Sequence, residues 1–182
     1  MRSSRPSSAA LLTTLAKLLF HHGTAEHHAP TEIMEAVNND FRSIFGARSF
    51  MTAMCVALDP ATGRATVVGA GHPPLLVART GGRTEAIASS APPLGLLERS
   101  EFIETNVDLE PGDAFFLYTD GIYGAGHDEN PRISSSRLGE MLQPMAENAQ
   151  ALLDRVVDQA ALNDGGKAAP DDIAAVAVRR VQ

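Results

Sequence analysis

The sequence predicts an α+β fold in which two helices come first, short antiparallel strands follow, and helices and a last strand end the chain. Two observations predict this order. Apolar residues recur at helical spacing near both ends of the chain, in about 8–22, 30–45 and 148–162. Between them, short apolar segments alternate with turns that contain Gly, Pro and Asp. Because strands joined by short turns pair antiparallel, we expect one layered domain over residues 1–182.

Two amphipathic helices are expected at the start of the chain. The first spans about Ser8–His22, with serines where a cap belongs and with Gly23 as the residue that ends it. The second follows Pro30, which is typical of a first helical turn. The predicted buried stripes consist of Leu11, Leu12, Leu15, Leu18 and Leu19 in the first helix, and of Ile33, Met34, Val37, Phe41 and Ile44 in the second.

Three β-hairpins are expected in the middle of the chain. Their turns are DPATG at 59–63, GG at 81–82 and EPGD at 110–113, each between two short apolar segments. The third hairpin therefore pairs EFIETNVDL with AFFLYTD. After it, SRLGEMLQPM predicts a weak helix and NAQALLDRVVDQAAL a strong one, and DDIAAVAVRR predicts a terminal strand.

Composition narrows the classes of protein to which the chain can belong. Its 182 residues are 44% hydrophobic and 20% charged, which is typical of a globular domain with a sizeable core. The net charge of -7, without a run of Lys and Arg, argues against nucleic acid or an anionic membrane as partner. Cys55 is the only cysteine, which predicts a small buried thiol and a cytoplasmic setting. No segment has the length of a membrane span or the pattern of a signal peptide.

Two acidic loci stand at predicted strand ends, next to residues that form turns. Asp120 and Gly121 follow AFFLYT, and Asp171 and Asp172 stand between Pro170 and IAAVAV. Carboxylates at strand ends are held more rigidly than those on loops, and oxygen ligands suit magnesium or manganese. An aspartate in such a place is also a common turn or cap residue. The pattern alone therefore leaves both interpretations open.

Histidines offer two further candidate sites. His72, in GAGHPP, stands between a strand and two prolines, which favours a turn-stabilising or partner-facing role over acid–base catalysis. The segment HHGTAEHH contains His21, His22, His27 and His28. Adjacent histidines at a helix end point in different directions, and no cysteine or acidic set completes a tetrahedron. A solvated linker is therefore favoured over a zinc site.

Five motifs, in this order, resemble the stage II sporulation E-like branch of the PPM metal-dependent protein phosphatases. They are GAGHPPLLVA, APPLGLL, DLEPGDAFFLYTDGIYGA, SRLGEML and PDDIAAVAVRR, and the match covers about 8–180. The resemblance implies an α-β-β-α sandwich of two antiparallel sheets flanked by helices. It also implies that two manganese or magnesium ions activate a water for attack on phosphoserine or phosphothreonine of a protein.

The resemblance also assigns roles to single residues. Asp120 and Asp171 correspond to metal ligands, whereas Asp172 stands at a position that varies among related phosphatases. Gly121 would let the chain turn tightly beside the metal, and His72 would have a supporting role. No catalytic residue is implied beyond the metal site.

The start of the chain departs from the family pattern. Family members carry GGDFYD-like and DVSGHG-like segments, each with a metal-binding aspartate, and Met1 stands where the second of these would be. The first strands of the sheets are also absent, so open sheet edges are expected. We therefore expect a domain truncated at its amino terminus. Three explanations stay open: a fragment or mis-started copy of a complete phosphatase, a degenerate relative, or a second polypeptide that supplies the missing part.

The leading hypothesis is a metal-dependent serine/threonine phosphatase of bacterial sigma-factor regulation, located in the cytoplasm. Its expected substrate is a phosphorylated anti-sigma-factor antagonist, and a homodimer is one assembly that the sequence allows. A second hypothesis is a non-catalytic module that keeps the fold and binds the same partner. A third is a stand-alone hydrolase of small phosphoesters.

Overall fold

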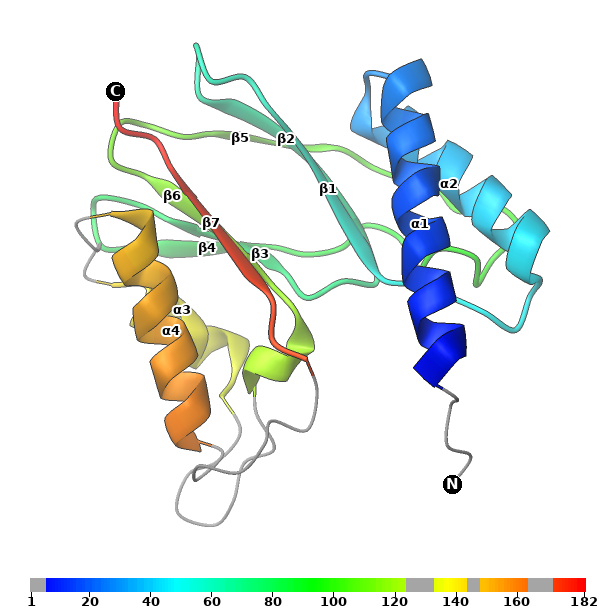
Figure 1. Cartoon of the computed structure of the whole chain (residues 1–182). Coiled ribbons are helices and arrows are strands. Elements are labelled where there is room, and N and C mark those ends of the chain that lie inside the picture. The colour runs from blue at the N-terminus through cyan, green and yellow to red at the C-terminus, as the bar shows by residue number, and fades with distance from the viewer. Residues whose placement is uncertain (1–5, 124–132, 144–147, 164–171) are drawn as a thin grey trace. The chain divides into compact units, whose positions relative to one another are not determined.

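The structure is a computed structural model of the chain, and it describes residues 6–123, 133–143, 148–163 and 172–182. Its elements follow the predicted order of helices, strands, helices and a last strand (Figure 1). They are α1 (Pro6–Glu26), α2 (Pro30–Phe45), β1 (Ala53–Leu58), β2 (Arg64–Ala70), β3 (Leu75–Ala78), β4 (Thr84–Ile87), β5 (Thr105–Asp108), β6 (Ala114–Tyr118), η1 (Asp120–Tyr123), α3 (Ser135–Met141), α4 (Ala149–Asn163) and β7 (Ala175–Arg179). Within the described ranges, no helix combines the length and the apolarity needed to cross a membrane.

The chain divides into two compact units. The first comprises Met1–Ala57, Thr66–Gly71 and Ser89–Asn106, and the second Leu58–Ala65, His72–Ala88 and Val107–Gln182. The strands form a three-stranded sheet of order β1-β2-β5 and a four-stranded sheet of order β4-β3-β6-β7. The sequence therefore predicted the helices and strands. The assignment of each strand to one of the two sheets depends on pairing between distant segments.

The core of the first unit lies under α2. This helix begins at Pro30 as predicted, and four residues of its predicted stripe are buried. Three of them, Ile33, Met34 and Val37, pack with apolar residues of β1, β2 and the segment 91–102, whereas Phe41 contacts Phe45 of the same helix. Ile44, the fifth residue of the stripe, is 55% exposed because it stands in the last turn of the helix. In α1, Leu19 packs against this core as predicted, but Leu18 is 56% exposed. The predicted stripes are therefore wrong at Leu18 and at Ile44.

Gly23 does not end the first helix. α1 continues to Glu26, and Gly23 is buried where α1 packs on α2. A Cβ atom at Gly23 would lie 3.4 Å from Cγ2 of Val37 and 3.5 Å from Cγ2 of Ile33. The prediction of a stop at this glycine is therefore wrong, because its missing side chain serves the close approach of two helices.

The core of the second unit lies between the four-stranded sheet and the helices α3 and α4, which cover one of its faces (Figure 1). β6 pairs antiparallel with β3 on one side and with β7 on the other. The buried residues include Leu76 and Phe116 of the sheet and Leu138, Leu152 and Val156 of the helices. Because α4 presents Leu152, Val156 and Ala160 at helical spacing, its inward face agrees with the sequence.

The third predicted hairpin is wrong. β5 pairs with β2 in the three-stranded sheet, whereas β6 lies between β3 and β7 in the other sheet. The Glu110–Asp113 turn is present, with the N–H of Asp113 donating to the carbonyl of Glu110 (2.9 Å). The chain changes sheets here because the N–H of Leu109 pairs with the carbonyl of Gly63, next to β2 (3.0 Å). The first two hairpins form as predicted, β1 with β2 and β3 with β4.

Candidate metal centre at the ends of β6 and β7

β6 ends just before the first candidate metal ligand. Four of its five residues are buried, because the strand is central in the four-stranded sheet. Thr119 follows the strand, and Asp120 begins the short 3-10 helix η1. The Asp120 side chain is exposed to solvent, whereas Gly121 is buried. An apolar, rigid strand therefore carries an exposed carboxylate next to its end.

The second acidic locus lies beside the first. β7 pairs with β6 in a register that places Ala175 opposite Tyr118, the last residue of β6. The backbone N–H of Thr119 extends this pairing by donating to the carbonyl of Ala174 (2.9 Å). Its hydroxyl donates to the carbonyl of Asp172 (3.0 Å) and accepts from the N–H of Ala174 (2.9 Å). The structure thus brings the segment that starts at Asp172 next to the segment that carries Asp120.

The side chain of Asp172 is exposed, like that of Asp120. Asp171, the stronger of the two candidates by resemblance, lies outside the described residues. Asp120 and Asp172 are 52 positions apart in sequence (172 minus 120), and their segments meet because β6 and β7 are neighbours. Local sequence patterns therefore could not predict that these two segments lie side by side.

The turn that follows Asp120 is anchored in the core. Ile122 is completely buried, and its N–H donates to the carbonyl of Thr119 (3.2 Å). The hydroxyls of Tyr118 and Tyr123 lie 3.0 Å apart, and their rings meet edge to face. Burial, followed by the hydrogen bond to Tyr123, raises the pKa of Tyr118, which keeps this phenol neutral. The backbone of Asp120 is therefore held on both of its sides.

The donor atoms at this strand end suit a hard divalent cation. Both exposed side chains offer carboxylate oxygens, the ligands that magnesium and manganese prefer. Such ions keep several bound waters, so they need few protein ligands. Within the described part of the chain, no group of three or more His, Cys, Asp and Glu side chains could hold a metal ion. Asp120 and Asp172 would therefore supply part of a coordination shell that water and other groups complete.

His72 lies between β2 and β3 and is half-buried. Its Nδ1 atom is 3.0 Å from the carbonyl oxygen of Pro73, a distance at which an Nδ1–H group donates a hydrogen bond. Such a contact within one turn is of the kind expected for a turn-stabilising side chain. The supporting role of His72 stays a prediction.

Other residues that the sequence singled out make local contacts. His22 lies 3.7 Å from Glu26 on α1, and His27 lies 3.9 Å from Glu32 near the start of α2. The side chains of His22, Glu26 and Glu32 are exposed, and that of His27 is half-buried. Because α1 extends to Glu26, His21 and His22 lie in a helix, so the prediction of a solvated linker is wrong for this part of the segment. Cys55 on β1 is half-buried against the first core, and burial raises the pKa of its thiol.

A buried acid that the sequence did not single out, Asp113, lies just before the other end of β6. Asp113 is 2% exposed, and its carboxylate accepts hydrogen bonds from the N–H of Thr80 (2.9 Å), the N–H of Glu110 (3.1 Å) and Nη1 of Arg79 (2.9 Å). Burial raises the pKa of this carboxyl group, but the hydrogen bonds and the Arg79 charge outweigh burial and lower it. In the sequence, Asp113 stands between the Pro111-Gly112 turn and an apolar strand. Because an ordinary turn has the same pattern, the sequence did not indicate that this acid is buried.

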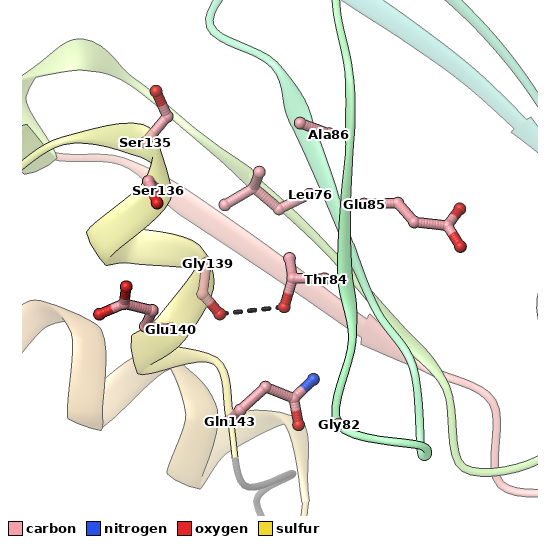
Figure 2. A pocket seen from close by; sticks show the side chains of 10 residues that line it. All are labelled: Leu76, Gly82, Thr84, Glu85, Ala86, Ser135, Ser136, Gly139, Glu140 and Gln143. Atoms are coloured by element: carbon pink, nitrogen blue, oxygen red, sulfur yellow. Dashed lines mark hydrogen bonds between the residues drawn. The ribbon is translucent and has the colours of Figure 1, made fainter.

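A pocket of about 570 Å³ lies elsewhere in the second unit, between the β3–β4 hairpin and α3 (Figure 2). Leu76, Thr84 and Ala86 line it from the sheet, and Ser135 and Ser136 line it from the helix. Thr84 Oγ1 donates to the carbonyl of Gly139, which ties β4 to α3 (2.9 Å). Of the predicted site residues that the structure describes, none lines this pocket.

Comparison with known proteins gives the family of the chain. A family model described as stage II sporulation protein E (SpoIIE) matches residues 7–181, which is nearly the whole sequence. The chain belongs to the SpoIIE family. The resemblance of the sequence motifs to this family is thereby confirmed.

Among curated SpoIIE-family relatives, the phosphoserine phosphatase RsbP of Bacillus subtilis is 30% identical over 119 residues. The alignment covers 63% of this chain and 30% of RsbP. Protein IcfG of Synechocystis is 26% identical over 131 residues, 72% of this chain and 21% of IcfG. The chain therefore spans less than a third of the length of either relative.

Solved structures show the same fold. The SiaA-PP2C domain of Pseudomonas aeruginosa superposes with a TM-score of 0.84 at 24% identity, over 97% of this chain and 72% of that one. RsbX in complex with magnesium superposes with a TM-score of 0.68 at 12% identity, over 96% of this chain and 75% of that one. The predicted fold class, with two antiparallel sheets and flanking helices, is thereby confirmed as that of PP2C-type phosphatase domains.

Proposed function

We propose that residues 1–182 belong to a domain that acts as a metal-dependent serine/threonine phosphatase on a bacterial regulatory protein. The observation that carries the proposal is the meeting of Asp120 and Asp172 at neighbouring ends of β6 and β7, in a chain of the SpoIIE family. Neither carboxylate is buried, so both can bind a cation and its waters.

The residues at this strand end have distinct parts in the proposal. Asp120 and Asp171 would bind magnesium or manganese, and Asp172 would add a ligand or orient the bound water. Gly121, which is buried in η1, would let the chain turn tightly beside the metal. A bound ion supplies Lewis acidity and an activated water for in-line attack at phosphorus. His72 would stabilise the turn before β3.

We propose a phosphoserine or phosphothreonine of an anti-sigma-factor antagonist as substrate. The name of RsbP, a phosphoserine phosphatase, supports the phosphorylated side chain. The net charge of -7 favours a protein partner over nucleic acid. A cytoplasmic setting and a homodimer belong to the same proposal.

Phosphate release from a phosphoserine protein, with and without manganese, tests the proposal. We expect manganese-dependent release by the wild-type chain and a loss of at least about 100-fold for Asp120→Asn and Asp171→Asn. Asp108→Asn is the matched control, because Asp108 is an exposed carboxylate on β5 and should leave the rate unchanged. Equal rates for wild type and Asp120→Asn would remove Asp120 from the site.

A second candidate function is a non-catalytic module that binds the partner. It is favoured by one observation: the described residues contain no cluster of three or more side chains that could hold a metal ion. Calorimetry separates the two functions. Binding of a phosphoprotein without any binding of manganese at millimolar concentration would support the module, whereas turnover by the purified chain would eliminate it.

A further inference from the structure

Thr119 is the side chain that ties the two acidic segments together. Its hydroxyl donates to the carbonyl of Asp172 (3.0 Å) and accepts from the N–H of Ala174 (2.9 Å). The hydroxyl also lies 3.4 Å from the carbonyl of Ala174, but its single proton favours the shorter contact to Asp172. One side chain thus satisfies a donor and an acceptor on the facing segment.

These contacts stand where the regular strand pairing ends. The ladder between β6 and β7 has its last pair at Tyr118 and Ala175. Beyond that pair, the backbone hydrogen bond from Thr119 to Ala174 joins the two segments (2.9 Å). Asp172 lies two residues further out, and the contact from the Thr119 hydroxyl reaches its carbonyl directly. The position of Asp172 relative to Asp120 therefore depends on this hydroxyl.

The turn that follows Asp120 is held by other groups. Its anchors are the buried Ile122, the backbone hydrogen bond from Ile122 to Thr119, and the contact between the hydroxyls of Tyr118 and Tyr123. Removal of the Thr119 hydroxyl leaves all three intact. Its loss should therefore loosen the Asp172 segment and leave η1 in place.

We propose that Thr119 is a positioning residue, whose hydroxyl sets the separation of the Asp120 and Asp172 carboxylates and thereby the affinity of this strand end for a divalent cation. The inference rests on the proposed function, because it assumes that these carboxylates bind the ion. A hydroxyl that orients the segments carrying metal ligands acts as outer-shell partners do in other metal sites.

Three variants test this role. Thr119→Val removes the hydroxyl at nearly constant volume, and Thr119→Ser keeps it. Thr84→Val is the matched control, because Thr84 also donates from Oγ1 to a backbone carbonyl, that of Gly139 (2.9 Å). Thr84 lies at the opposite end of the same sheet, opposite Ala78, which in turn pairs with Ala114 at the start of β6.

Manganese binding measured by calorimetry is the first readout. We expect Thr119→Val to weaken binding by about 10–100-fold, Thr119→Ser to restore wild-type affinity, and Thr84→Val to leave affinity unchanged. If the wild type binds manganese and Thr119→Val binds it equally well, the positioning role is wrong and the proposed function stands. If the wild type binds no manganese, the proposed function fails, and the role of Thr119 fails with it.

Amide hydrogen exchange in metal-free protein is the second readout. Because Thr119→Val removes the acceptor of the Ala174 N–H, we expect faster exchange at Ala174 and unchanged exchange at Ile122. Equal exchange at Ala174 in Thr119→Val and wild type would show that the hydroxyl does not hold the Asp172 segment, whatever the metal result. Faster exchange at both amides would mean that the hydroxyl supports the whole strand end, which would overturn the specific role.

Discussion

Two aspartates at opposite ends of β6 show how much a single residue depends on its surroundings. Asp113 precedes the strand and follows Gly112, and Asp120 follows the strand and precedes Gly121. In the sequence, each is an acid between a glycine and an apolar run. In the structure, Asp113 is buried and its carboxylate accepts hydrogen bonds. The side chain of Asp120 is instead exposed to solvent, where a ligand can reach its carboxylate. Burial and hydrogen bonding, rather than residue type, separate the structural acid from the candidate ligand.

Asp113→Asn should destabilise the protein. The substitution keeps the shape of the side chain but removes the charge that pairs with Arg79 and accepts two backbone N–H groups. We expect the free energy of unfolding to fall by about 1–3 kcal/mol, measured by urea denaturation at pH 7. Asp108→Asn, an exposed carboxylate nearby, should change it by less than about 0.5 kcal/mol.

The difference between wild type and Asp113→Asn should depend on pH. Because the pKa of Asp113 is lower in the folded protein than in the unfolded chain, its stabilisation is complete above the ordinary carboxyl value, about 3.9. It is lost as pH falls through the lower, folded-state pKa. Urea denaturation should therefore give a constant difference near neutral pH and a shrinking one below about pH 4. A difference that stays constant down to pH 3 would argue against the charge of Asp113 as its source.

At the scale of elements, the packing of α1 on α2 depends on a glycine whose role the sequence did not reveal. Gly23 was expected as a helix stop, because glycine is common just after a helix. It lies instead within α1, and the space that a side chain would fill is next to Ile33 and Val37 of α2. Helix ends and helix contacts both favour glycine, so the residue alone does not distinguish them.

Gly23→Ala and Gly23→Leu distinguish these two roles. The added Cβ of alanine would make ordinary contacts at 3.4–3.5 Å, and alanine is the better helix former. We expect the free energy of unfolding to rise by about 0.5–1 kcal/mol for Gly23→Ala and to fall by about 1–3 kcal/mol for Gly23→Leu, which overfills the contact. A clear loss of stability for Gly23→Ala would instead favour a helix-ending conformation.

At the scale of the molecule, the connection between the sheets depends on a crowded corner around Gly63. The carbonyl of Gly63 accepts from the N–H of Leu109 (3.0 Å) just after β5. Nη1 of Arg180, just after β7, donates to the carbonyls of Thr62 (2.7 Å) and Leu109 (2.6 Å). Three segments that are distant in sequence therefore meet at one glycine. This corner is where the chain passes from β5 to a strand of the other sheet, instead of forming a third hairpin.

Gly63→Ala should be more harmful than Gly82→Ala. Both glycines have positive φ, +78° and +84°, so alanine costs about 1–2 kcal/mol of backbone strain at either position. At Gly63 the Cβ atom would also lie 2.6 Å from the carbonyl oxygen of Leu109, whereas at Gly82 nothing lies within 4 Å. We expect Gly63→Ala to lower the free energy of unfolding by a further ~1–3 kcal/mol in paired urea denaturation experiments. Equal losses would contradict the crowding of this corner.

The sequence by itself determined the elements and the family. Apolar periodicity and turn residues act over a few positions, so they predicted the four helices, the first two hairpins and the terminal strand. The order of the motifs, from GAGHPP to PDDIAAVAV, was enough to identify the SpoIIE family. The position of Asp120 at the end of an apolar strand was predicted in the same way.

Only the tertiary structure decided which distant segments meet. It placed β5 and β6 in different sheets, buried Asp113 beside Arg79 and made Gly23 a helix contact. It also set Asp172 beside Thr119, next to Asp120. The physical reason is that strand pairing and burial depend on contacts between residues far apart in the chain, about which local spacing carries no information. The sequence therefore supplied the carboxylates, and the pairing of β6 with β7 made them one candidate site.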